Sequence, residues 1–353
     1  MSKIAVLSKW IAASAIAVAV GLTTGQAIAQ AKVDGPKVEW QFSVWGNARA
    51  FTRGIEYVAK YVEDQTGGKF VIKIAYGGTL SPEKENLDGI KIGAFESAAV
   101  CTSYHPGRNP AANGLDLPFL PLESFDVARA VYEAFYLTPA AKEEMAKWDA
   151  MLYMAGILPQ YEFMGVGAPP LKIEDWKGKR VRAIGGLGEA MRLLGASPIA
   201  PPASEVYTAL DRGTVDAASF PFTYAHASYK LQEISKWYTT NMSPSTSNCP
   251  YVISQKAWAK LPPQYQKLLI DAKDGAYTAL KAAYKEADDK NLPDFQKRGL
   301  IAVTYSKEDL AKFREIAAKP VWDKWVAEVE AKGLPGKQLL QLILDTAKKA
   351  GAS

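Results

Sequence analysis

The chain has 353 residues, of which 48% are hydrophobic and 22% are charged. These fractions are those of an ordinary globular protein and exclude a disordered or fibrous chain. The formal net charge is +5, from 42 Lys and Arg against 37 Asp and Glu, and no basic block stands out. The composition therefore does not indicate a nucleic-acid-binding protein. At this length we expect about two domains.

Residues 1–29 have the pattern of a secretory signal peptide. Two lysines precede an apolar run over residues 10–22, and a small-x-small cleavage pattern follows. The run is short for a membrane span, although an uncleaved anchor is the alternative interpretation. We take cleavage after Ala29 or Ala31. No other stretch approaches the length of a membrane span, so we expect an exported, periplasmic protein that does not itself span the membrane.

Strand and helix patterns alternate along the mature chain. Strand-like segments over 37–46, 69–78 and 96–104 are separated by segments with helical spacing of apolar residues. This alternation predicts a parallel α/β sheet. The pattern changes character at about 151–170, which we interpret as a crossing into a second α/β unit. That unit includes the strand 179–184, and a long helical tract and a basic helical tail follow it.

The cysteines and histidines do not indicate a metal site. Cys101 and Cys249 lie in apolar, strand-like contexts that suit buried free thiols as well as the disulfide that an exported protein can hold, and we lean slightly to unpaired thiols. His105 and His226 lack the HxxH and HExxH spacings, so zinc hydrolase chemistry is poorly supported. We predict no metal and no cofactor.

The segment WKGKRVRAIGGLGEAMRLLGASPIAPPASEVYTALDRGTVDAASFP, residues 176–221, is similar to the solute-binding receptors of tripartite ATP-independent periplasmic (TRAP) transporters, dicarboxylate-receptor type. The segments LDLPFL and VISQKAWAKLPPQYQKLL resemble further parts of the same family. The resemblance implies a two-lobed, type II-like α/β periplasmic binding protein fold, whose lobes are joined by crossing strands and a long hinge-spanning helix. We assign 30–159 and about 244–285 to the first lobe, and 160–243 and about 286–353 to the second.

The resemblance also assigns one residue to the ligand. In the family, the arginine of the matching strand binds the ligand carboxylate, and Arg182 is its match. A guanidinium offers a planar fork that suits a carboxylate. Arg180, two residues earlier on the same side of the strand, is expected at the rim or in a structural role. We interpret Gly185 and Gly186 as leaving room for the ligand beside the strand end.

The chain departs from the family pattern where other members carry a second arginine. That region contains Tyr161 and Glu162 instead, and we expect them to contact the ligand, Glu162 as a hydrogen-bond acceptor. The alternative for Glu162 is an ion pair with a nearby lysine. A polar residue common in the family is replaced by Phe220. We therefore expect a site with no second cation, which disfavours a dianionic ligand.

Several aromatic residues are candidates for the cleft. Trp45 and Tyr104 lie at the ends of expected strands, Phe220 lies at the end of the motif described above, and Phe222 directly follows that motif. Their rings suit a monocarboxylate with an apolar or aromatic body. Packing in the core is the alternative for each of them.

These observations predict a solute-binding receptor and not an enzyme. We expect it to capture an organic acid, either a monocarboxylate with an aromatic body or a keto or hydroxy acid, and to deliver it to the membrane permease subunits of a TRAP transporter. A dicarboxylate-specific receptor is one alternative. An exported hydrolase is another, but the sequence has no G-x-S-x-G motif, and we predict no catalytic residue.

Overall fold

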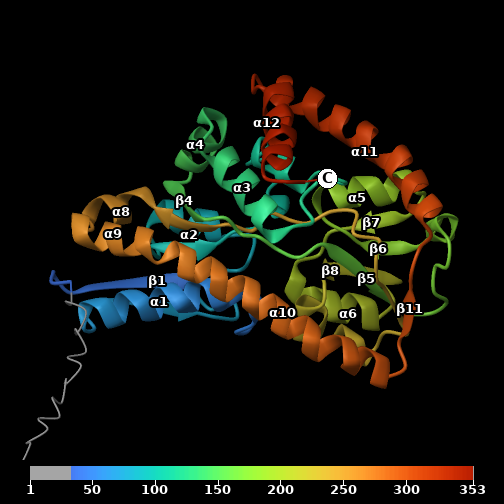
Figure 1. The fold of residues 1–353 in the computed structure, drawn as a ribbon, viewed down its shortest axis with the longest axis horizontal. Helices are drawn as coiled ribbons and strands as arrows, with labels where there is room; N and C mark the ends of the chain where they lie inside the picture. The colour runs from blue at the N-terminus through green and yellow to red at the C-terminus, as the bar shows by residue number, and fades with distance from the viewer. Residues whose placement is uncertain (1–32, 353) are drawn as a thin grey trace, which may run out of the picture. The chain divides into compact units, whose positions relative to one another are not determined.

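The computed structural model describes residues 33–352, and the predicted signal peptide lies outside this part of the chain. Two β-sheets organise the described residues, each with helices packed against it (Figure 1). The first sheet has the strand order β2-β1-β3-β10-β4. Its strands, in chain order, are β1 Val38–Ser43, β2 Phe70–Ala75, β3 Ser97–Ala99, β4 Ala150–Met154 and β10 Tyr251–Ser254.

The second sheet has the strand order β11-β9-β5-β8-β6-β7. Its strands are β5 Tyr161–Gly165, β6 Arg180–Arg182, β7 Ser197–Ile199, β8 Ala217–Pro221, β9 Trp237–Thr239 and β11 Ile301–Val303.

Both sheets are mixed: the predicted parallel pairing holds for β1 with β2 and β3, but other strands are antiparallel. In the first sheet, β10 runs antiparallel to β3 and β4, and in the second, β5 runs antiparallel to β8 and β9. Strands β5 and β10 are the ones that the chain enters directly from the other sheet. They arrive without the helical crossover that a parallel neighbour requires, so antiparallel pairing is available to them.

The helices follow the strand–helix alternation that the sequence predicts. Those of the first half of the chain are α1 Arg53–Thr66, α2 Asn86–Ile92, α3 Phe125–Tyr136 and α4 Pro139–Ala146. The second unit contributes α5 Gly185–Leu193, α6 Val206–Asp211 and α7 Tyr224–Ser228. The C-terminal part contains α8 Gln255–Lys260, α9 Pro263–Asp271, α10 Lys273–Lys297, α11 Lys307–Glu330 and α12 Gly336–Lys349.

Three connections join the two sheets. The segments after β4 and after β9 run beside each other, as the hydrogen bond from Tyr161 N to Ser245 O at 2.9 Å shows. The third connection is α10, which contacts α1 beside the first sheet and α7 beside the second (Figure 1). A helix of 25 residues is long enough to bridge two lobes.

Large aromatic side chains fill the core of each lobe. Phe42 and Phe51 pack against Tyr251 in the first, and Trp176 packs against Phe163 and Trp237 in the second, all of them fully buried. Burial of side chains of this size supplies most of the driving force for folding. In the described part of the chain, no helix has the length and apolar character needed to cross a membrane.

Candidate functional site

Arg182 is the last residue of β6 and is completely buried. Its Nη1 donates a hydrogen bond to the carbonyl oxygen of Ser219 at 2.8 Å, and its Nη2 lies 3.4 Å from the hydroxyl oxygen of Tyr104. The neighbouring Arg180 and Arg192 form ion pairs with carboxylates, whereas none of residues 33–352 forms one with Arg182. A buried cation without a counter-charge is costly, so this guanidinium is suited to an anionic ligand.

Arg182 lines a cavity of about 30 Å³ to which residues of both lobes contribute. None of the described residues lining it is an aspartate or a glutamate. A cavity of this size holds about two water molecules. Seven aromatic side chains contribute to its wall: Trp45, Phe51, Tyr104, Tyr161, Phe220, Tyr224 and Tyr229. A positively charged, ring-lined wall fits a small organic anion.

The structure brings five predicted site residues to this cavity: Trp45, Tyr104, Tyr161, Arg182 and Phe220. The Phe220 ring lies under the guanidinium, with its centroid 4.7 Å from Cζ of Arg182. Tyr104 packs edge-on against Trp45, at a centroid distance of 6.3 Å. The first sheet positions Trp45 and Tyr104, and the second positions Tyr161, Arg182 and Phe220, so the candidate site lies between the two lobes.

The family described as "Bacterial extracellular solute-binding protein, family 7" matches residues 43–328 of this chain. The chain belongs to this family of solute-binding receptors. One relative is the monocarboxylate 2-oxoacid-binding periplasmic protein of Nostoc sp., which is 26% identical over 309 residues, covering 83% of this chain and 84% of the relative. The family predicted from the sequence is thereby confirmed.

Solved structures show the same two-lobed fold. A marine metagenome TRAP solute-binding protein specific for aromatic acid ligands, in complex with 3-hydroxybenzoate, matches with a TM-score of 0.80 at 19% identity, over 90% of this chain and 100% of that one. A TRAP periplasmic solute-binding protein from Desulfovibrio salexigens with bound orotic acid matches with a TM-score of 0.80 at 23% identity, over 88% and 99%. The predicted fold class is confirmed.

Phe222 does not line the cavity of this receptor, which corrects the sequence-based expectation. Its ring stacks on Tyr238 at a centroid distance of 6.0 Å and meets His226 edge-on. Phe220 and Phe222 would face the same side if the strand continued, but β8 ends at Pro221. The chain turns there, so strand alternation no longer sets the direction of Phe222.

Glu162 also lies outside the cavity of the receptor. Its carboxylate accepts hydrogen bonds from the Thr239 hydroxyl, from Ser243 N at 2.8 Å and from Met242 N at 3.2 Å. The predicted ligand contact and the alternative lysine pair are both corrected. Neighbouring residues on a strand point to opposite faces, so Tyr161 faces the cavity and Glu162 faces the segment after β9. Burial raises the pKa of Glu162, and these hydrogen bonds oppose that change.

Arg49 is a cavity residue that the sequence interpretation missed. Its side chain lines the same cavity as Arg182, so the expectation that the site lacks a second cation is corrected. The sequence interpretation sought a second arginine only around residues 160–163. The signal that it overlooked is that Arg49 follows β1 closely, in the same loop as Trp45.

Cys101 and Cys249 form a disulfide bond, which corrects the prediction of unpaired thiols. Backbone hydrogen bonds hold the two segments together on either side of the bridge, from Val100 N to Pro250 O and from Thr102 N to Asn248 O. The cysteines are distant in the sequence, and the pairing of β3 with β10 brings them together. Both sulfur-bearing residues line the cavity of the receptor.

The two glycines after Arg182 are also corrected in their role. Gly185 and Gly186 form the first turn of α5. A Cβ atom on Gly186 would lie 2.5 Å from the carbonyl oxygen of Asp116 and 2.9 Å from Cα of Leu117. The missing side chain of Gly186 therefore allows α5 to pack against the segment 116–117, and neither glycine lines the cavity of Arg182.

The hydroxyl of Tyr104 stays protonated beside the guanidinium. Burial raises the pKa of Tyr104 to about 12, although the charge of Arg182 acts in the opposite direction. The oxygen of this hydroxyl also accepts a hydrogen bond from Ala203 N at 3.2 Å. The cavity thus presents cations and neutral phenols at physiological pH. Within residues 33–352, no cluster of three His, Cys, Asp or Glu side chains is arranged to hold a metal ion.

Proposed function

We propose that this chain is the periplasmic receptor of a TRAP transporter and that it binds a small organic acid through Arg182. The observation that carries this proposal is a fully buried guanidinium with no ion-pair partner among the described residues, on the wall of a cavity between the lobes. A carboxylate accepts two parallel hydrogen bonds from a guanidinium. In a water-poor cavity, the attraction between the two charges is stronger than at a surface.

The remainder of the ligand packs against aromatic rings. Trp45, Tyr161 and Phe220 offer ring faces and edges that suit an aromatic or short aliphatic body. Two relatives support an acid as the ligand, since one is named for monocarboxylate 2-oxoacids and the other was solved with 3-hydroxybenzoate. The ligand class proposed for this chain is accordingly a small carboxylate of aromatic, keto or hydroxy type.

Export and delivery complete the proposed function. The N-terminal pattern over residues 1–29 acts as the signal peptide, and the mature receptor works in the periplasm. It delivers the acid to the membrane permease subunits of the transporter. Closure of the two lobes on a ligand changes the shape of the receptor, so the permease can distinguish the ligand-bound form from the open form. The receptor binds its ligand without chemical conversion.

Replacement of Arg182 tests this proposal. A thermal-shift screen of the mature protein against aromatic, keto, hydroxy and dicarboxylic acids first identifies a binder, which calorimetry then quantifies. We expect Arg182→Gln to weaken binding by about a hundredfold or more, because a desolvated carboxylate would lose its cation.

Arg180→Gln is the matched control. Arg180 lies two residues away on the same strand but is exposed and pairs with Asp216. We expect this variant to keep the affinity of the wild type within about twofold, as surface ion pairs contribute little. Wild-type affinity in a folded Arg182→Gln variant would overturn the assignment.

A further inference from the structure

A second guanidinium faces the site from the opposite lobe. Arg49 lies in the loop between β1 and η1 (Ala50–Thr52), beside the first sheet, whereas Arg182 ends a strand of the second sheet. Both side chains line the same small cavity. Arg49 is partly exposed, and none of residues 33–352 forms an ion pair with it, although Arg53 pairs with Glu56.

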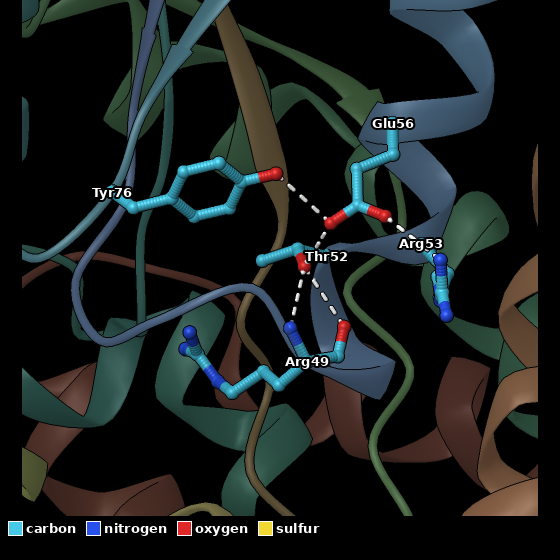
Figure 2. A network of polar contacts seen from close by, with 5 residues as sticks. All are labelled: Arg49, Thr52, Arg53, Glu56 and Tyr76. Carbon is cyan, nitrogen blue, oxygen red and sulfur yellow. Dashed lines mark hydrogen bonds and ion pairs between the residues drawn. The ribbon is translucent and has the colours of Figure 1, made fainter.

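A polar network fixes the backbone of Arg49 (Figure 2). Arg49 N donates a hydrogen bond to Oγ1 of Thr52 at 3.0 Å, and that hydroxyl lies 2.6 Å from Oε1 of Glu56. The same carboxylate accepts a hydrogen bond from Tyr76 at 2.9 Å and pairs with Arg53 at 3.4 Å. Figure 2 shows the guanidinium of Arg49 pointing away from Glu56. The network therefore holds the loop while leaving the charge of Arg49 uncompensated.

The side chain of Arg49 is itself held in place. Its Nη1 donates to the carbonyl oxygens of Trp45 at 2.7 Å and Asn47 at 2.8 Å. Its Cζ lies 5.2 Å from the ring centroid of Phe51 and 6.0 Å from that of Tyr229. The side-chain hydrogen bonds found within the described residues all use Nη1, so Nε and Nη2 keep donors for a ligand. Little side-chain entropy remains to be lost on binding.

Two stacked aromatic rings link the guanidinium of Arg182 to that of Arg49 through their contacts. Phe220 contacts Arg182, and Tyr229 contacts Arg49. The rings of Phe220 and Tyr229 lie 5.0 Å apart at an interplanar angle of 9°. The wall thus presents one guanidinium at each end of a ring pair, with no acidic residue among the described residues that line it. Two positive charges in one cavity repel each other until an anion or several oxygen acceptors neutralise them.

We propose that Arg49 is a second ligand-binding residue and that it selects acids with a second oxygen acceptor, a hydroxyl or a carboxylate, remote from the carboxylate on Arg182. This inference rests on the proposed function, since it assumes that Arg182 binds the first carboxylate. Arg49 adds a charge-assisted hydrogen bond to the far end of the ligand. The receptor therefore prefers hydroxy acids and dicarboxylates to the parent monocarboxylates.

Acids that differ only in a second oxygen acceptor distinguish the contribution of Arg49 to binding from that of Arg182. The probes are benzoate, 3-hydroxybenzoate and isophthalate, together with butanoate, 4-hydroxybutanoate and succinate, each titrated by calorimetry into the mature protein. We expect the wild type to bind the hydroxy or carboxy acids about tenfold to a hundredfold more tightly than the parent acids. Arg49→Gln should remove this preference and leave the affinity for the parent acids nearly unchanged. Arg49→Lys should restore it in part for the dicarboxylates.

The control variant is Arg108→Gln, which removes an exposed arginine of the same lobe that pairs with Asp88 and does not line the cavity. It should keep the wild-type preference, and circular dichroism and thermal unfolding should show every variant folded. If Arg49→Gln keeps the preference for hydroxy and carboxy acids, the inference is overturned. An equal loss of affinity for all acids also overturns it, because it indicates that Arg49 only packs on the rings. Arg182→Gln should lose its affinity for all of the acids. If it retains that affinity, or if the wild type binds none of the acids, the proposed function itself fails.

Discussion

His226 is buried in α7 in its neutral form. Its Nε2 donates a hydrogen bond to the carbonyl oxygen of Glu162 at 3.1 Å, and its ring meets Phe220 edge-on. Burial lowers the pKa of His226 to about 3, the hydrogen bond to Glu162 opposes this change, and the charge of Arg182 adds to it. The imidazole therefore packs behind the cavity wall as an uncharged donor.

This neutral histidine makes the stability of the receptor sensitive to acid. In the unfolded chain the pKa is about 6.5, so at lower pH the unfolded state binds a proton that the folded state does not. The contribution of His226 is complete above pH 6.5, and the free energy of unfolding falls by about 1.4 kcal/mol per pH unit below it. We expect His226→Gln to be less stable at pH 7, through lost packing, yet to avoid about 2 kcal/mol of the loss between pH 7 and pH 5.

Urea unfolding at the two pH values measures this difference. Asp116 acts with the opposite sign, since burial raises its pKa from 3.8 to about 7 and the stability gained from its bound proton is lost as the pH rises through that window. Both proteins keep Asp116, so its contribution cancels in the comparison. Equal pH slopes for the wild type and His226→Gln would contradict the assignment.

At the scale of single elements, the point at which a strand ends and the face that it presents determine which predicted residues reach the site. The sequence predicts the strands that carry Tyr161 and Phe220, and it places Arg182 correctly at a strand end. It also predicts that Glu162 and Phe222 reach the site. This happens because a local pattern determines neither which face of β5 meets the other lobe nor the residue at which β8 ends. Both depend on tertiary pairing, which sets the face that meets the other lobe.

The disulfide between the segments of β3 and β10 gives a prediction about these two elements. The bridge closes a sequence separation of 148 residues, so its removal frees the unfolded chain from a long constraint. We expect the double variant Cys101→Ser/Cys249→Ser to lose about 2–4 kcal/mol in free energy of unfolding. The backbone hydrogen bonds from Val100 and Thr102 keep the strands paired, so the double variant should still fold.

Guanidinium chloride unfolding, with and without reductant, tests the role of the bridge. Reductant should destabilise the wild type by a similar amount and leave the double variant unaffected. Thiol titration of the denatured, unreduced wild type should find no reactive thiol at Cys101 or Cys249. A reactive thiol at both positions, or a reductant effect on the double variant, would disagree with the pairing.

At the scale of the whole molecule, the sequence predicts the two-lobed fold, because the order of its motifs is that of a known family. It does not predict that Arg49 lies across the cavity from Arg182. That arrangement depends on how the lobes face each other, through contacts between residues far apart in the sequence. The pairing of the crossing strands was missed for the same reason, since α/β alternation alone does not encode the direction of a strand that enters from another lobe.

The small volume of the cavity leads us to expect that the lobes separate before an acid enters. A space of about 30 Å³ does not hold even butanoate, so binding includes an opening and a closing step. One of the contacts across the lobes outside the cavity involves Glu83. Oε1 of Glu83, in the loop before α2, accepts hydrogen bonds from the hydroxyl of Ser204 at 2.8 Å and from Ser204 N at 3.3 Å. This contact joins the two lobes, so we expect their separation to break it.

We therefore expect Glu83→Gln to release a bound acid roughly tenfold faster while its association rate stays near that of the wild type, because a charged acceptor strengthens the closed state alone. Stopped-flow tryptophan fluorescence with the acid identified by thermal shift measures both rates. Glu85→Gln, an exposed neighbour on the same loop, is the matched control and should leave both rates unchanged. An equal effect on the rates in the two variants, or a change in the association rate alone, would show that the contact of Glu83 does not stabilise the closed state. Closure would then depend on the ligand contacts themselves.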